Sequence, residues 1–85
     1  MIYEWRCNMA ISDEIKVIRQ KALMTQETFA KALQVAFSTV NRWEAGKAHP
    51  SMSAMNQIKT FCDENGISFD ELQNTWIEET KESRK

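Results

Sequence analysis

Apolar residues recur every three or four positions along most of the chain, which is the period of an α-helix with one buried face. Short polar joins interrupt the pattern and divide it into five segments. The sequence therefore predicts an all-α fold with five helices. We expect them at about residues 12–22, at 25–33, between Ala36 and Gly46, from Ser51 to the "ENG" sequence, and at about 68–79.

Side chains that favour helix starts support this division. The predicted N-caps are Ser12, Thr25, Ser51 and Ser68. Ser68 and Glu71 have the spacing of a capping box, and Ile67 and Leu72 have that of a hydrophobic staple. Gly46 is expected to end the third helix in a left-handed conformation.

Only Gln34 and Val35 lie between the second and third predicted helices. Two helices joined by so tight a turn have to cross at a steep angle, as in a helix-turn-helix. On the third helix the spacing turns Val40 and Trp43 inward. The residues on its outer face and rim are Phe37, Ser38, Asn41 and Arg42. These side chains suit the edges of base pairs in a major groove, although Ser38 and Asn41 could equally be solvated surface.

The two ends of the chain differ from this helical middle. Residues 1–11 form an N-terminal arm in which Tyr3, Trp5, Cys7 and Met9 alternate with polar residues, as in a strand. Such an arm is either flexible or half of an intermolecular pairing. Residues 12–80 form the domain, and the polar tail 81–85 is expected to fray.

The net charge of −1 conceals an uneven distribution. Residues 15–61 carry seven Lys and Arg against two acids, a net +5, whereas residues 1–14 sum to −2 and residues 62–85 to −4. A basic middle is expected if that part of the chain faces a polyanion, but an ordinary surface can be equally uneven.

Other classes of function find little support in the 85 residues. Cys7 and Cys62 lack metal-ligand spacing and have only His49 as an imidazole partner, so neither a metal nor a disulfide framework is expected. No catalytic set or phosphate-binding loop is recognisable, so we expect no enzyme activity and no cofactor. No apolar run approaches the length of a membrane span, which makes the cytoplasm the expected compartment.

The segment "IKVIRQKALMTQETFAKALQVAFSTVNRWEAGKAHP" resembles the helix-turn-helix of the Cro/C1-type (XRE) family of DNA-binding regulators. The likeness extends over about residues 15–72. The matching positions are Arg19, Leu23, Thr25-Gln26-Glu27, Phe29-Ala30, Leu33, Val35, Ser38-Thr39-Val40, Arg42-Trp43-Glu44, Gly46 and Pro50. The resemblance implies a five-helix, lambda-repressor-like domain whose second and third helices form the helix-turn-helix.

The resemblance also implies roles for individual side chains. The residues implied to contact bases are Phe37, Ser38, Arg42, Gln26 and, as a weaker candidate, Asn41. Gln26 also matches a position that contacts a phosphate. The expected phosphate contacts are Thr39, Lys47, Lys16 and Lys31. Glu44 is expected to form an internal salt bridge with Arg19 rather than a base contact.

Two positions depart from the family pattern. Gln34 stands where the family usually has glycine, so a non-glycine residue is expected to adopt positive φ there. Ala36 stands where Ser or Thr usually caps the recognition helix, and losing such a cap costs about 1 kcal/mol.

The function expected from these features is sequence-specific binding of double-stranded DNA by a transcription regulator, most simply a repressor. The alternative is an antitoxin-like or protein-interaction module that uses the same fold. A two-fold homodimer is expected because one small module buries too little surface to be specific. Its dimer surface is predicted at Tyr3, Trp5, Trp76 and Ile77.

Overall fold

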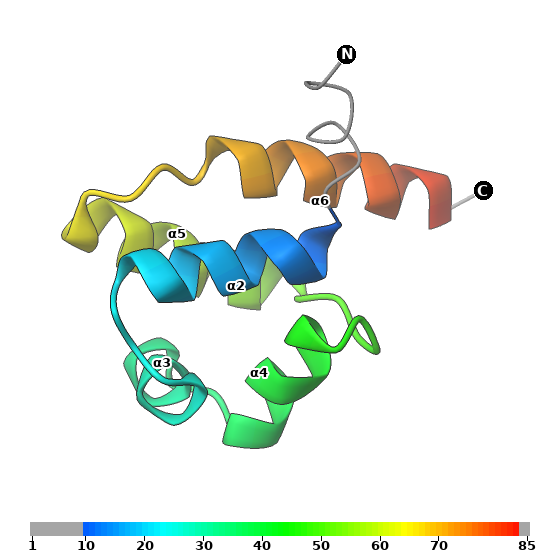
Figure 1. Cartoon of the computed structure of the whole chain (residues 1–85). Helices are drawn as coiled ribbons and strands as arrows, with labels where there is room; N and C mark the ends of the chain where they lie inside the picture. The colour runs from blue at the N-terminus through cyan, green and yellow to red at the C-terminus, as the bar shows by residue number, and fades with distance from the viewer. Residues whose placement is uncertain (1–9, 84–85) are drawn as a thin grey trace, which may run out of the picture.

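The computed structural model describes residues 10–83, and within that range the fold is made of α-helices without strands. The helices are α2 (Ile11–Lys21), α3 (Gln26–Leu33), α4 (Phe37–Glu44), α5 (Met52–Asn65) and α6 (Asp70–Ser83). In Figure 1, α2 and α6 run across the upper part of the molecule, and α3 and α4 lie below them. The five-helix, lambda-repressor-like prediction is confirmed. The predicted strand pattern in the N-terminal arm lies outside the described residues.

The helix-turn-helix is formed by α3 and α4, as predicted. Figure 1 shows α3 nearly along its axis while α4 runs across the view, so the two helices cross steeply. Thr25 caps α3 through a 3.1 Å hydrogen bond that the Thr28 backbone N–H donates to its hydroxyl oxygen. Gln34 does adopt the left-handed conformation, with φ 63°. Ala36 occupies the N-cap of α4 and provides no side-chain hydrogen bond.

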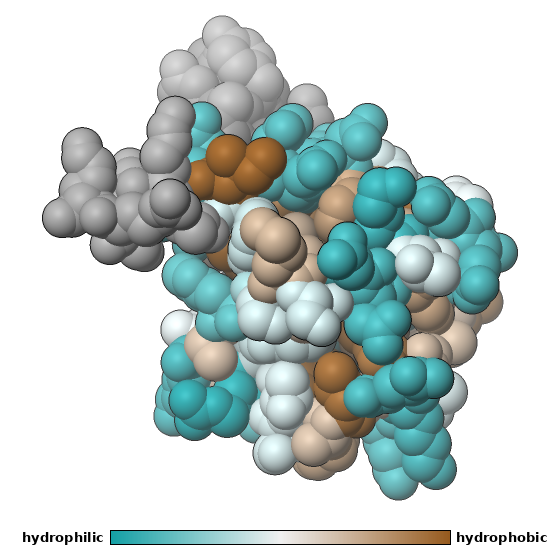
Figure 2. Space-filling view, turned by 180° about the vertical axis from the view of Figure 1, so that it is seen from behind, coloured by the Kyte–Doolittle hydropathy of each residue, from teal (hydrophilic) through white to brown (hydrophobic). Residues whose placement is uncertain are grey.

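The core lies where the five helices meet. Its buried apolar residues are Ile11, Ile15, Ile18, Phe29, Ala30, Leu33, Val40, Trp43, Met55, Ile58, Phe61, Cys62, Phe69 and Leu72. The rings of Phe29 and Phe61 meet edge to face with their centroids 5.2 Å apart, a geometry that suits the charge distribution of aromatic rings. Apolar surface on the face seen in Figure 2 is confined to separate patches among hydrophilic side chains.

The start of α2 differs from the prediction. The helix begins at Ile11, and Ala10 rather than Ser12 takes the N-cap position without a side-chain hydrogen bond. Ile11 is almost fully buried and lies on the same face as Ile15 and Ile18. Burial of Ile11, worth about 1.5–3 kcal/mol, therefore outweighs the capping hydrogen bond that Ser12 would provide, worth about 1 kcal/mol.

The bounds of α6 also differ from the prediction. The helix begins at Asp70, and the Phe69 carbonyl accepts the backbone hydrogen bond of Gln73. Ser68 lies one position too early to act as the N-cap, so the predicted capping box with Glu71 is wrong. Phe69 is buried instead. At its other end α6 continues to Ser83, into the tail that was expected to fray.

The ends of α2, α3, α4 and α5 share one backbone arrangement. In each, the residue that follows a left-handed position donates its N–H to a carbonyl five positions back, for example Lys47 to Arg42 at 2.9 Å. This hydrogen bond is part of the Schellman motif, which requires a left-handed residue after the helix. Gly46 and Gly66 supply that residue for α4 and α5. Leu23 supplies it for α2 with φ 59°, a conformation that the sequence analysis missed.

Replacing Leu23 with glycine is expected to stabilise the domain. The side chain is 92% exposed, so little packing is lost. The left-handed conformation costs a non-glycine residue about 1–2 kcal/mol, and glycine avoids this cost. Glycine also has greater conformational entropy in the unfolded chain, which lowers the gain by about 0.5–1 kcal/mol. Urea denaturation should therefore show a gain of about 0.5–1 kcal/mol for Leu23→Gly. The control Leu23→Ala keeps the Cβ and should differ little from the wild type. Equal stability of the two variants would contradict this account.

Candidate nucleic-acid interface

The helix α4 presents one face to the core and another to solvent. Val40 and Trp43 are buried, which fixes the rotation of the helix. Phe37 is 51% exposed, and Ser38, Asn41 and Arg42 are exposed as well. The inward and outward faces predicted for this helix are therefore those of the structure. The outer face combines a planar cation, two small polar groups and an apolar ring.

A salt bridge holds the last residue of α4 against α2. The Arg19 guanidinium donates from Nε to Glu44 Oε2 at 2.7 Å and from Nη2 to Glu44 Oε1 at 3.0 Å. Its third nitrogen donates to the Met24 carbonyl at 3.0 Å. The Glu44 side chain is only 2% exposed, so protein donors rather than water stabilise its charge. The two residues that were expected to pair thus form a bidentate, partly buried ion pair.

Gln26 connects this ion pair to the exposed face of α4. Its Nε2 donates to Glu44 Oε1 at 3.0 Å, and its Oε1 accepts a 3.1 Å hydrogen bond from Asn41 Nδ2. Arg19, Glu44, Gln26 and Asn41 therefore form one chain of hydrogen bonds from α2 through α3 to the outer face of α4. Since both ends of the Gln26 amide are engaged, its orientation is set before any ligand arrives.

The residues predicted to contact phosphates occupy different parts of the domain. Thr39 is half-buried on α4, and Lys47 is exposed just after that helix. Lys16 is exposed on α2 and Lys31 on α3. Within residues 10–83, no hydrogen bond or ion pair joins Lys16 or Lys31 to α4. Thr39 and Lys47 are thus close to the outer face of α4 in sequence, whereas the other two belong to neighbouring helices.

The predicted dimer residues fall into two groups. Tyr3 and Trp5 lie outside the described residues. Trp76 packs partly against the core of its own chain, and its indole N–H donates to the Pro50 carbonyl at 2.7 Å. Ile77 is 46% exposed on α6. Of the described pair, Ile77 is therefore the side chain with apolar surface to offer a second copy.

Other kinds of site are not supported by the described part of the chain. No group of three or more His, Cys, Asp or Glu residues in it is placed to hold a metal ion. None of its helices is long and apolar enough to cross a membrane. Burial raises the pKa of the Cys62 thiol to about 11, which makes this thiol a poor nucleophile at neutral pH.

The geometry of α3 and α4 agrees with comparisons with known proteins. A family model described as "Helix-turn-helix" matches residues 15–72, which include all of α3, α4 and α5. The chain belongs to the Cro/C1-type helix-turn-helix family of DNA-binding regulators. The residues that match the family model, 15–72, are also those over which the sequence resembles the family.

Among curated proteins, the chain is similar to the HTH-type transcriptional activator BcrR of Enterococcus faecalis. The two are 30% identical over 64 residues, which make up 75% of this chain. The aligned part covers only 30% of that relative's length. No solved structure matches the chain significantly.

Two side-chain interactions near the interface were missed by sequence reasoning. The first is the hydrogen bond between Asn41 and Gln26, which lie on different helices. The second joins His49 to α6, where its Nε2 lies 3.3 Å from Glu79 Oε1. No local pattern in the sequence indicates either pairing, because both depend on how the helices cross.

Removing the guanidinium is expected to destabilise the domain by about 3 kcal/mol, because Arg19→Met leaves the buried Glu44 carboxylate without its charged partner. The double variant Arg19→Met/Glu44→Leu should recover a large part of this loss, since it removes the buried charge as well. A double-mutant cycle by urea denaturation measures the coupling. Strictly additive effects would show that the pair does not act as a unit.

Proposed function

We propose that this domain binds double-stranded DNA sequence-specifically, with α4 in the major groove, and regulates transcription. The observation that carries the proposal is the outer face of α4, where an exposed Arg42 lies one turn from Ser38 and next to Asn41, with the half-exposed Phe37 at the rim. A major groove admits a helix and presents hydrogen-bonding groups and thymine methyls to it. The family membership of the chain supports this reading.

In this proposal the side chains on α4 divide the recognition among them. The Arg42 guanidinium is a planar double donor that matches O6 and N7 of guanine, so we assign it the main base contact. Phe37 offers an apolar surface to a thymine methyl. Ser38 and Asn41 provide shorter donors and acceptors, and Asn41 is oriented by Gln26.

The phosphate contacts come from groups around this face. Gln26 is the first residue of α3, where free backbone N–H groups and the helix dipole favour an anion. Its amide supports both Asn41 and a nearby phosphate. Thr39 and Lys47 flank the reading face, and Lys16 and Lys31 extend the positive charge to α2 and α3. Such contacts fix the register of the protein on DNA without reading its sequence.

Repression by occupying an operator requires no surface beyond the one proposed here, and we propose it as the regulatory effect. The printed name of the Enterococcus faecalis relative is that of an activator, but this chain covers only 30% of that protein. A promoter fused to the selected operator separates the two effects, because repression lowers reporter output and activation raises it.

The Arg42→Ala substitution should change which DNA sequence is preferred. On the best operator, selected from a random duplex pool, it is expected to cost about 1–3 kcal/mol, and preference at one base pair per half-site should flatten. The control Lys47→Ala should instead weaken all sequences alike and reduce the slope of log K against log salt by about one. If Arg42→Ala lowers affinity for specific and random duplexes by the same factor, Arg42 is a backbone contact.

We also propose that the protein binds as a homodimer through α6, with Ile77 at the contact. Two half-sites about one helical turn apart would then be read together. Ile77→Glu should weaken the dimer in sedimentation equilibrium while leaving the folded monomer intact, because the side chain is already half exposed. The control Ile77→Val keeps an apolar side chain at this position and should dimerise as the wild type does. A wild-type protein that stays monomeric on its operator would contradict the proposal.

A further inference from the structure

The carboxyl group of Glu14 is buried between α2 and α6. The residue is only 8% exposed. Its Oε2 accepts a 2.9 Å hydrogen bond from the Thr75 hydroxyl on α6. Its Oε1 is also buried and has no hydrogen-bond partner. An ionised carboxylate in this position would have one oxygen without compensation, which is costly away from water.

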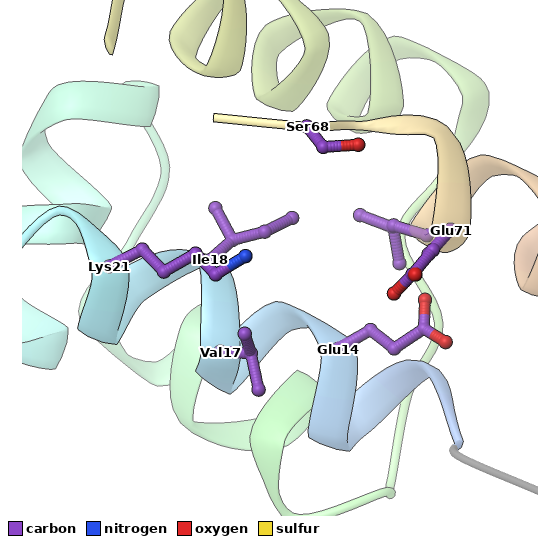
Figure 3. A pocket seen from close by; sticks show the side chains of 7 residues that line it. Glu14, Val17, Ile18, Lys21, Ser68 and Glu71 are labelled. Carbon is purple, nitrogen blue, oxygen red and sulfur yellow. The ribbon is translucent and has the colours of Figure 1, made fainter. Parts of the chain in front are cut away.

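A small cavity of about 80 Å³ adjoins this carboxyl group. Figure 3 shows the side chains of Glu14 and Glu71 extending toward each other across one end of the cavity. The residues that line the cavity are Glu14, Val17, Ile18, Lys21, Ser68, Glu71 and Leu72. Three of these seven residues, Val17, Ile18 and Leu72, are aliphatic, and Glu71 cannot stabilise a second negative charge.

The charged groups around Glu14 mostly oppose its ionisation. Burial is the main reason that the pKa of Glu14 is raised above its ordinary value. The hydrogen bond from Thr75 acts in the opposite direction, and the charges of Glu71, Asp13 and Glu79 raise the pKa further. Lys21 lines the cavity but forms no ion pair with Glu14 within residues 10–83.

The turn of α6 that contacts Glu14 also contacts the loop after α4. Trp76, next to Thr75, donates its indole N–H to the Pro50 carbonyl at 2.7 Å. One turn later, Glu79 lies 3.3 Å from His49 in the same loop. A shift of α6 away from α2 would therefore disturb the loop that begins at Gly46 and contains Lys47.

From this arrangement we propose that the contact between α2 and α6 is a proton-sensitive joint. Burial beside Glu71 favours the uncharged form of Glu14 there, and ionisation of Glu14 loosens α6 and, through Trp76, the loop after α4. Since the pKa of Glu14 is higher in the folded than in the unfolded chain, its contribution to stability is complete at acidic pH, below the ordinary pKa. That contribution is lost as the pH rises through the folded-state pKa.

The test compares the full chain with Glu14→Gln, which keeps an uncharged acceptor of similar size for Thr75. Hydrogen exchange of the Trp76 indole proton reports on the contact with Pro50, and Trp76→Phe identifies its resonance among the three tryptophans. As the pH rises from about 5 through the folded-state pKa of Glu14, exchange should accelerate more in the wild type than in Glu14→Gln. The extra acceleration is limited to about tenfold for each pH unit that separates the pKa values of Glu14 in the closed and opened states. Base catalysis speeds the intrinsic exchange of the indole proton equally in both proteins, so its effect cancels in the comparison.

The pKa of Glu14 can also be measured directly, so that the test does not depend on the folding of Glu14→Gln. Carbon-13 NMR of the Glu14 carboxyl group in the wild type should give a pKa above the ordinary value for glutamate. In Glu71→Gln the pKa of Glu14 should be lower than in the wild type. Titration of Glu14 at or below its ordinary value would overturn the proposal. The proposal would also be overturned if the ratio of the wild-type exchange rate to the Glu14→Gln exchange rate stayed the same at every pH. The contact with Pro50 would then not respond to ionisation of Glu14.

Discussion

The ion pair between Arg19 and Glu44 is the interaction on which the arrangement of the first three described helices depends. Glu44 is the last residue of α4, and its carboxylate accepts hydrogen bonds from both α2 and α3. A buried ion pair often contributes little net stability, because desolvation offsets the attraction. Its value here is geometric, since only one rotation of α4 places Glu44 under the guanidinium. That rotation is also the one that buries Val40 and Trp43.

The same constraint extends outward to the candidate reading face. Because Glu44 holds Gln26, and Gln26 holds Asn41, polar groups at the surface are fixed by a buried charge several residues away. Around this network the backbone accepts strain, with left-handed residues Leu23 and Gln34 at the two ends of the segment that contains α3. Non-glycine residues persist in such conformations only where the surrounding contacts over-determine them. The turn after α2 meets this condition, because Arg19 also binds the Met24 carbonyl.

The sequence predicted those parts of the fold that depend on short spacings. The five helices, the inward face of α4, and the caps at Thr25 and Ser51 follow from local pattern. The predictions at Ser12 and Ser68 were wrong because a capping side chain competes with burial of a neighbouring apolar residue, and only the folded core decides between them. The hydrogen bond from Thr75 to Glu14 joins residues 61 positions apart, so no local signal indicates it. For the candidate site, spacing indicated which residues face outward, but not that Gln26 and Asn41 are bonded to each other.

The helix α6 occupies a special place in this architecture because it contacts elements on both sides of the helix-turn-helix. It packs on α2 through Leu72 and Thr75, and it reaches the loop after α4 through Trp76 and Glu79. Polar contacts at a joint of this kind can be altered by a single proton, whereas apolar packing cannot. Most small domains lose stability on acidification because their carboxylates are stabilised as anions in the folded state. Glu14 contributes with the opposite sign, since its burial favours the neutral form, and α6 therefore holds the loop most firmly at acidic pH.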